Sequence, residues 1–312
     1  MGGKMNKIIL IFAFFLLMGA FSACASVQDA IFNMGVSFAR SQSDFVTKSI
    51  QAGDHRIAYL EREAKGETIV FLHGFAASKD NWLFLTRRLP KTYRVLAIDM
   101  PGYGDSSAFS DQSYSADQIT RRLAAAINEL KPERFHLAGN SLGGYIATLY
   151  AAQYPDKVIS LGLIDSAGVD SPSEFFTLLS KGDNPLVFDT EKGFDRLADF
   201  IFYKKPFMPW PSKAASARKY LRRSAMNKKL WNDIWDNRKD VTDILPKLNM
   251  PVMLIWGDKD RVLDMSGIEI YKRYLPQAKS HILKDCGHAP MIERPGETAA
   301  AYLKFLTSSA KH

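Results

Sequence analysis

The chain has 312 residues, of which 46% are hydrophobic and 24% are charged, with a formal net charge of +8. These values are ordinary for a globular protein, so they exclude large-scale disorder and favour a sizeable buried core. The length fits one large α/β domain or two smaller ones. The two cysteines are too few for a disulfide framework, and no zinc or iron–sulfur spacing is present, so no metal site is predicted.

Residues 1–24 have the layout of a signal peptide. Two lysines precede an unbroken apolar run from Ile8 to Phe21, and small residues follow it. The run is shorter than the roughly 20 residues that span a bilayer, so we expect export, with an uncleaved signal anchor as the alternative. The stretch Phe21 to Cys24 resembles a bacterial lipobox, in which the cysteine is acylated, although leucine is usual at the first position. We therefore expect a membrane-associated protein of the bacterial cell envelope, with a secreted or periplasmic protein as the alternative.

Apolar, β-rich runs alternate with helical patterns through most of the chain, which is typical of βαβ units with a mostly parallel sheet. The predicted strands are Ile57–Leu60, Thr68–Leu72, Val95–Ile98, Phe135–Ala138, Val158–Ile164 and Val252–Trp256. The predicted helices are Lys79–Leu89, Ala116–Leu130 and Leu142–Tyr154, with another helix between Ser26 and Asp44. From residue 169 to 246 the strand rhythm stops, and a segment of that length is expected to be a helical cap over a site. The sequence therefore predicts an α/β core over 45–168 and 247–308, flanked by helices, with a cap over 169–246.

The run Gly139-Asn140-Ser141-Leu142-Gly143 directly follows a predicted strand and opens a predicted helix. A nucleophile elbow requires this setting, because a sharp strand-to-helix turn leaves no room for side chains beside the serine. An ordinary glycine-rich turn is the alternative interpretation. A serine hydroxyl is a weak nucleophile that needs a base, which is itself oriented by an acid. Ser141 is therefore the candidate nucleophile.

In this kind of site the acid and then the histidine follow the serine along the chain. His288 lies in a glycine-flanked loop after a strand-like segment, whereas His281 lies within that segment. His288 is therefore the predicted general base. Asp258, Asp260 and Asp264 follow the last of the predicted strands, at whose carboxyl end α/β sites gather, and position alone does not choose among them.

The run His73-Gly74-Phe75 ends another predicted strand, where backbone N–H groups can point toward a developing oxyanion. The predicted oxyanion-hole donors are the backbone N–H groups of Phe75 and Leu142. His73 and Gly74 are supporting residues, and we interpret His73 as a packed structural imidazole.

Together these motifs resemble the α/β-hydrolase superfamily from about residue 45 to 308. More narrowly, they are similar to the lipases of cold-adapted Moraxella and Psychrobacter and to the mammalian monoacylglycerol lipase called α/β-hydrolase domain-containing protein 6. The residues that carry this resemblance are Leu72–Phe75, Lys79–Asn81, Asp99–Gly104, Gly139–Ser141 and Trp256–Asp264. The resemblance implies that Asp260 is the catalytic acid. It also implies an esterase or monoglyceride lipase, with a small lipid or ester as substrate and neither a metal nor an organic cofactor.

Other classes of protein stay open as alternatives. Serine-dependent carbon–carbon bond hydrolases of the same fold share the elbow pattern through Gly144, but they usually place tryptophan after the catalytic histidine, where this chain has Ala289. A non-catalytic lipid-binding protein is a more distant alternative. The pI near 9.3 suggests nucleic-acid binding, but no nucleic-acid motif is present, so no such partner is predicted. The basic cluster between Lys213 and Lys229, on a predicted helix, makes a membrane surface a candidate partner.

Overall fold

The structure, a computed structural model, describes residues 25–208 and 211–309. Its described residues form an eight-stranded sheet with the strand order β1-β2-β4-β3-β5-β6-β7-β8. The strands are β1 Val46–Ala52, β2 His55–Arg62, β3 Thr68–Leu72, β4 Arg94–Ile98, β5 Phe135–Asn140, β6 Val158–Ile164, β7 Val252–Gly257 and β8 Lys279–Leu283. β2 pairs antiparallel with both β1 and β4, and the other neighbouring strands are parallel. The predicted α/β fold with a mostly parallel sheet is confirmed.

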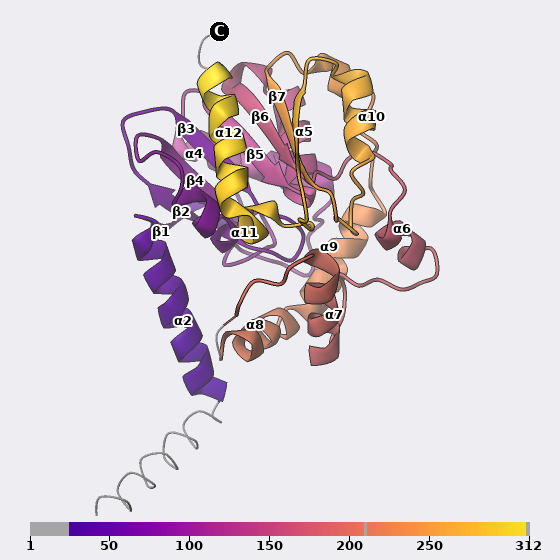
Figure 1. Ribbon diagram of the computed structural model, residues 1–312. Coiled ribbons are helices and arrows are strands. Elements are labelled where there is room, and N and C mark those ends of the chain that lie inside the picture. Colours follow the sequence, from indigo (N-terminus) through magenta and orange to yellow (C-terminus); the bar gives the residue numbers. More distant parts are fainter. Residues whose placement is uncertain (1–24, 209–210, 310–312) are drawn as a thin grey trace, which may run out of the picture.

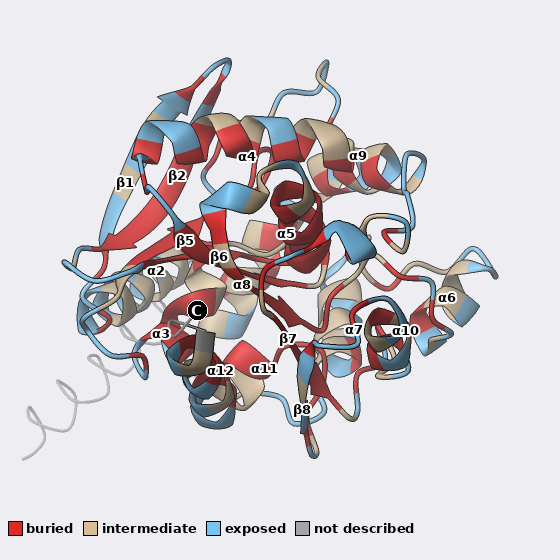
Figure 2. Cartoon of the chain, turned by 90° about the horizontal axis from the view of Figure 1, so that it is seen from above, coloured by how far each residue is buried: buried red, intermediate tan, exposed pale blue. Residues whose placement is uncertain are grey.

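Helices cover both faces of this sheet (Figure 1). The α-helices are α2 Ala25–Gln42, α3 Leu83–Thr86, α4 Ala116–Leu130, α5 Leu142–Gln153, α6 Glu174–Leu179, α7 Glu191–Ile201, α8 Ser212–Leu221, α9 Ser224–Trp235, α10 Gly267–Tyr274, α11 Pro290–Glu293 and α12 Pro295–Ser309. Short 3₁₀-helices occur at η1 Lys79–Trp82, η2 Pro155–Lys157 and η3 Leu245–Lys247. Seen along the sheet, α4 and α5 lie on one side of it and α3 and α12 on the other (Figure 2).

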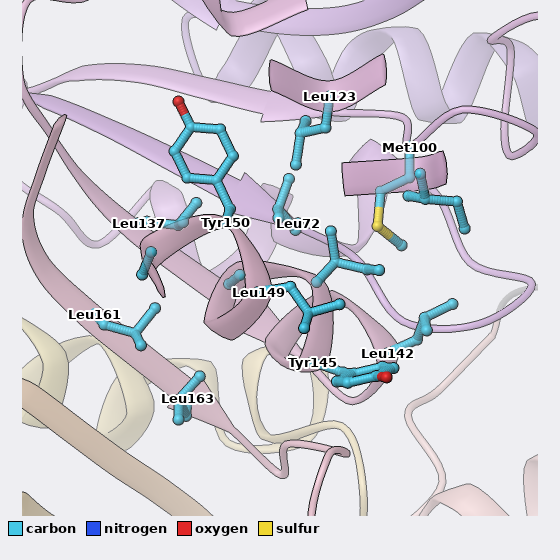
Figure 3. Packing of buried hydrophobic residues seen from close by; sticks show 14 of the residues in the cluster. Leu72, Met100, Leu123, Leu137, Leu142, Tyr145, Leu149, Tyr150, Leu161 and Leu163 are labelled. Atoms are coloured by element: carbon cyan, nitrogen blue, oxygen red, sulfur yellow. The ribbon is translucent and has the colours of Figure 1, made fainter. Parts of the chain in front are cut away.

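The central strands are apolar along their whole length because both faces of the sheet are covered. β3, β5 and β7 have no exposed residue, and alternate side chains enter two separate cores. Figure 3 shows Leu137 and Leu161 of the sheet near Leu149 and Tyr150 of α5. Each fully buried leucine contributes roughly 2 kcal/mol by leaving water, so this layer holds the carboxyl ends of the strands in place.

All six predicted strands are confirmed, but the sequence analysis missed β1. This edge strand is mostly exposed and polar, with Lys48 on it, a composition that protects an edge from unwanted pairing and hides the apolar alternation of a strand. The helix predicted over Lys79–Leu89 is wrong in extent, since the structure has only η1 and the single turn of α3 there. The carbonyl oxygen of Thr86 cannot accept an α-helical hydrogen bond, because the residue four positions later is Pro90, which lacks an N–H. The guanidinium of Arg62 donates to the carbonyl oxygens of Thr86 and Pro90 instead, at 3.0 Å each.

The amino-terminal helix α2 is confirmed, and no residue on it is buried. It runs beside α8, where Arg218 binds Asp29 with a shortest N–O distance of 2.6 Å. The predicted signal peptide and Cys24 lie outside the described residues. Over residues 25–208 and 211–309, none of the helices combines the length and the apolar character that a membrane crossing needs.

The segment 169–246 contains α6, α7, α8 and α9, which lie together at one end of the sheet (Figure 1). The prediction of a single basic helix is wrong, because the cluster from Lys213 to Lys229 is divided between α8 and α9. Part of its charge is paired locally. For example, Arg218 and Arg222 both pair with Asp29, and Lys229 pairs with an aspartate on its own helix.

Candidate active site

Ser141 lies at the turn between β5 and α5 with an unusual backbone conformation. Its φ is 55° and its ψ is −121°, values that cost a non-glycine residue energy and that recur at functional sites. The Ser141 N–H donates to the carbonyl oxygens of Ile164 and Asp165, at 3.0 and 3.1 Å, which fixes the turn against the end of β6. A Cβ atom on Gly139 or on Gly143 would lie 2.2 Å from backbone oxygen atoms. The glycines are therefore required by the closeness of the backbone, as the elbow motif predicts.

His288 and Asp260 form a buried hydrogen-bonded pair. The Nδ1 atom of His288 lies 2.7 Å from Oδ2 of Asp260. The other oxygen of Asp260 accepts the backbone N–H groups of Val262 and Leu263, at 2.8 and 3.0 Å. An ionised carboxylate only accepts hydrogen bonds, so Nδ1 carries the imidazole proton and Nε2 is left as an acceptor. This is the tautomer that a general base toward a serine hydroxyl needs.

The two other candidate acids point elsewhere. Asp258 accepts a hydrogen bond from the backbone N–H of Cys286 at 3.3 Å, and Asp264 accepts one from the N–H of Ser266 at 2.9 Å. Within the described part of the chain, neither of these carboxylates is hydrogen-bonded to His288. The geometry therefore favours Asp260, the residue that the family resemblance implies.

The loop of His288 is tied to the nucleophile elbow and to helix α7. The side-chain amide of Asn140 donates to the carbonyl oxygens of Ile164 and His288, at 3.1 and 3.2 Å. The backbone N–H of His288 donates to the carbonyl oxygen of Ile201 at 2.8 Å, at the end of α7. Asn140 therefore has a positioning contact as well as its place in the elbow.

The backbone around Gly74 is oriented by a buried histidine. Nε2 of His73 accepts the N–H of Met100 at 3.1 Å, so Nδ1 carries the proton and donates to the carbonyl oxygen of Gly74 at 2.7 Å. Burial lowers the pKa of His73, which keeps its imidazole neutral. Because C=O and N–H point in opposite directions across a trans peptide, this bond turns the N–H of Phe75 away from His73. The N–H of Leu142, at the first position of α5, is one of the helix N–H groups that lack an intrahelical acceptor.

A charge network centred on the buried pair of Lys79 and Asp99 lies beside His73, and the sequence analysis missed it; its second carboxylate, Asp105, is exposed. The Lys79 ammonium lies 2.6 Å from Oδ2 of Asp99 and 2.6 Å from Oδ2 of Asp105. Burial alone would lower the pKa of Lys79, but these carboxylates raise it above its usual value. Gly104 has φ 55°, and a Cβ atom there would lie 2.1 Å from Cγ of Asp99.

Two cavities meet at Ser141. The larger has a volume of about 370 Å³ and includes His288, Asn140 and the side chains of Lys219 and Arg223 among its lining residues. The smaller, of about 90 Å³, is mainly apolar. Its lining includes Leu142, Tyr145, Val169, Phe175, Phe176, Trp231, Trp235 and Leu263. Ser141 and Phe75 line both cavities, so a substrate at Ser141 can reach two spaces of different volume.

Asp165 also belongs to this site, and the sequence analysis did not single it out. It directly follows β6, whereas Asp260 lies in the loop after β7, and one ligand atom of each of Asp165, Asp260 and His288 lies within 4.8 Å of the others. The signal available in the sequence was its place at the carboxyl end of a predicted parallel strand, where polar residues of α/β sites gather.

The sheet order, the strained serine after β5 and the histidine–carboxylate pair after β7 and β8 define a protein of the α/β-hydrolase fold. Residues 69–301 match the alpha/beta hydrolase family, and the chain belongs to it.

Similar proteins agree with this assignment. Lipase 3 of Moraxella sp. (strain TA144) is 34% identical over 279 residues, which is 86% of this chain and 87% of that protein. Monoacylglycerol lipase ABHD6 of Bos taurus is 30% identical over 270 residues, or 82% of this chain and 80% of that protein. The crystal structure of a membrane phospholipase A, described as a bacterial virulence factor, is 37% identical with a TM-score of 0.90, covering 98% of this chain and 100% of that one. The predictions of the family and of a serine ester hydrolase are confirmed.

Proposed function

We propose that Ser141, His288 and Asp260 form the catalytic triad of a carboxylic ester hydrolase that cleaves monoacylglycerols or other esters of short to medium acyl chains. The observation that carries this proposal is the strained Ser141 in a cavity that His288 also lines, with His288 held by Asp260. The expected chain order of serine, acid and histidine adds support.

In the proposed mechanism, Oγ of Ser141 attacks the ester carbonyl carbon while Nε2 of His288 removes the hydroxyl proton. The carbonyl oxygen becomes an oxyanion that the N–H groups of Phe75 and Leu142 receive. The imidazolium then gives its proton to the leaving alcohol, which departs and leaves an acyl ester on Ser141. A water molecule, deprotonated by His288, hydrolyses this acyl-enzyme to release the acid and restore the serine.

The two cavities support a division of the substrate at Ser141. The smaller, apolar cavity suits the acyl chain, and its volume of about 90 Å³ favours a short one. The larger cavity is also mainly apolar, with Phe194 and Leu197 on its wall. Lys219, Arg223 and Asn227 line a polar part of it, and we assign a polar alcohol such as glycerol to that part. The names of the relatives, lipase and monoacylglycerol lipase, fit this assignment.

A fluorophosphonate probe and a panel of p-nitrophenyl esters and monoglycerides test the enzyme assignment. Ser141→Ala is expected to abolish labelling and to lower kcat by a factor on the order of 10⁶. Ser78→Ala is the matched control, because Ser78 lines the same cavity. Labelling of Ser141→Ala at the wild-type level would refute the proposed nucleophile. Cleavage of a vinylogous diketone in place of the esters would favour the carbon–carbon bond hydrolases.

The acyl-chain assignment has its own test. Trp231 stacks on Trp235 in the smaller cavity, with ring centroids 5.3 Å apart, so Trp231→Ala opens that space. The ratio of kcat/KM for dodecanoate over butyrate esters is expected to rise about tenfold, the effect of roughly 1.4 kcal/mol of added apolar contact. Phe194→Ala in the larger cavity is the control. A shift in chain-length preference from Phe194→Ala alone would reverse the proposed division.

We also propose that residues 169–246 act as a cap over the site. Independently, we propose that the enzyme is held on a bacterial envelope membrane by its amino terminus. The apolar run at residues 8–21 supports this anchor, as does α2, on which Met34 and Phe38 are 63% and 67% exposed. The basic residues of α8 and α9 add to the attraction to a membrane only in part, because Lys213, Arg218, Arg222 and Lys229 are paired with aspartates. Cell fractionation with mass analysis of wild type and Cys24→Ser is the test. A soluble periplasmic wild-type protein with unmodified Cys24 would contradict the anchor.

A further inference from the structure

Asp165 is a buried carboxyl group with an incomplete set of hydrogen bonds. Its φ is 42°, its N–H donates to the carbonyl oxygen of Ile255 at 2.9 Å, and its own carbonyl oxygen accepts the N–H of Ser141 at 3.1 Å. One carboxyl oxygen, Oδ1, accepts the N–H of Gly257 at 2.9 Å. The other, Oδ2, is buried and receives no hydrogen bond in the described part of the chain. An ionised Asp165 would therefore hold an unsatisfied negative oxygen, which is costly.

Asp165 also lies beside a second buried carboxyl group, that of Asp260. Ionising two carboxylates that share a buried site has a large free-energy cost, because their negative charges repel each other, so one of them keeps a proton. Asp260 accepts three hydrogen bonds, two from backbone N–H groups and one from His288, whereas Asp165 accepts one. Because hydrogen bonds to the charged form stabilise it, the negative charge belongs on Asp260 and the proton on Asp165.

The surroundings of Asp165 act in the same direction. Burial and the negative charge of Asp260 raise the pKa of Asp165 well above the usual range of an aspartate, and Glu293 adds to the effect. Burial likewise raises the pKa of the neighbouring Cys286 thiol, so no negative sulfur competes for the proton. The facing titratable groups are thus Asp260, His288, Cys286 and Glu293.

We propose that Asp165 is a neutral carboxylic acid that donates its O–H to the carboxylate of Asp260 and so positions the acid of the triad. The proposal rests on the triad proposed above. The proton stays on Asp165 throughout turnover, while His288 takes the Ser141 proton and returns it to the leaving alcohol. The hydrogen bond stabilises the anion of Asp260, which holds that carboxylate toward Nδ1 of His288 and disfavours transfer of the imidazolium proton onto it.

A metal ion is the competing occupant of this cluster, because one histidine and two carboxylates are metal-ligand types. The hydrogen bonds of the cluster favour a proton over a metal ion. Both oxygens of Asp260 and Oδ1 of Asp165 already accept N–H groups, so only Oδ2 of Asp165 is without a donor. A structural zinc site needs four ligand atoms, whereas only one oxygen is left without a partner here. One O–H group on that oxygen satisfies it.

The test combines infrared spectroscopy of the resting protein with kinetics. Wild type at pH 7 is expected to show the carbonyl stretch of a protonated carboxylic acid, which disappears in Asp165→Asn and persists in the control Asp258→Asn. Asp165→Asn should keep kcat within about threefold, because its amide can donate to Asp260 and accept from Gly257. Asp165→Ala should lose about 10- to 100-fold in kcat with little change in KM, since a hydrogen bond to a charged group is lost.

Three results would overturn the proposal. The first is a wild-type protein without that infrared band. The second is an Asp165→Asn variant as inactive as Asp260→Asn, which would make Asp165 an ionised acid. The third is a stoichiometric divalent ion whose removal by chelation abolishes activity. The spectrum is independent of turnover, so a retained band in an enzyme without esterase activity would refute the proposed function and leave the neutral Asp165 standing.

Discussion

Replacing Asp260 by asparagine tests the triad most directly, because the structure predicts how the new amide is oriented. Oδ1 of Asp260 accepts the N–H groups of Val262 and Leu263, at 2.8 and 3.0 Å. An asparagine keeps its carbonyl oxygen at those two donors, so its NH₂ group faces His288. Two donors cannot face each other, and the imidazole must move its proton from Nδ1 to Nε2. Nε2, the nitrogen that the proposed mechanism uses toward the Ser141 hydroxyl, is then a donor and no longer a base.

The magnitude follows from this change of tautomer. The equivalent substitution in serine proteases lowers kcat by about 10⁴, which corresponds to about 5.5 kcal/mol at 1.36 kcal/mol per tenfold. The fold should be unaffected, because the shape and both backbone hydrogen bonds are kept. The assay is kcat on p-nitrophenyl butyrate at saturation, beside thermal melting of each variant. Asp258→Asn and Asp264→Asn are the controls, each expected within about threefold of wild type.

Two results would show that this reasoning is wrong. If Asp260→Asn kept a tenth of the wild-type kcat, the carboxylate would not be what orients His288. If Asp258→Asn were the crippling change, the hydrogen bond between Nδ1 and Oδ2 at 2.7 Å would not be the one that matters in solution.

Two further predictions concern the packing that supports the site. Gly104→Ala places a Cβ atom 2.1 Å from Cγ of Asp99 and should cost more than about 3 kcal/mol in urea unfolding. Gly53 has a similar φ of 59°, but nothing lies within 4 Å of a Cβ atom placed on it, so Gly53→Ala should lower the free energy of unfolding by only about 1 kcal/mol. Equal losses of stability in Gly104→Ala and Gly53→Ala would refute the steric reason. Lys79→Met leaves a carboxylate buried without its cation and should cost about 3–5 kcal/mol. Lys91→Met breaks an exposed pair with Asp44 and should leave the free energy of unfolding nearly unchanged, and a loss at Lys79 no larger than at Lys91 would contradict the role of burial.

The sequence predicted the central part of the fold because burial on both faces demands continuous apolar strands. β3, β5, β6 and β7 each follow that pattern, and the polar residues that end them marked the edge of the sheet where the site lies. β1 escaped because an exposed edge strand has polar residues on both faces. The helix after residue 78 was overextended because the carbonyl oxygen of Thr86 accepts from Arg62, which is distant in sequence, and not from a further α-helical turn.

The residues of the site were predictable to different degrees. Ser141 was found because its glycines are a local requirement of the turn. The order of the triad then left few histidines to choose from. Choosing Asp260 by geometry required the three-dimensional structure. Asp258, Asp260 and Asp264 lie in one loop, and the sequence does not show which of them faces His288. The place of Asp165 at the end of a predicted strand was visible in the sequence, but its role was not, because that role depends on the contact of β6 with β7.

The side chains of the site are held in fixed relative positions, because each loop at the carboxyl ends of the strands is hydrogen-bonded to the next loop. The N–H of Ser141 donates to the carbonyl oxygen of Asp165, and the N–H of Asp165 donates to that of Ile255 in β7. The loop after β7 is tied in turn to the loop of His288, since the N–H of Lys259 donates to the carbonyl oxygen of Cys286 at 2.9 Å. Errors in position therefore do not accumulate from strand to strand, although the residues are distant in the chain. Such preorganisation lets the donors and the base stay in place while charge develops on the substrate, without a reorganisation cost during the reaction.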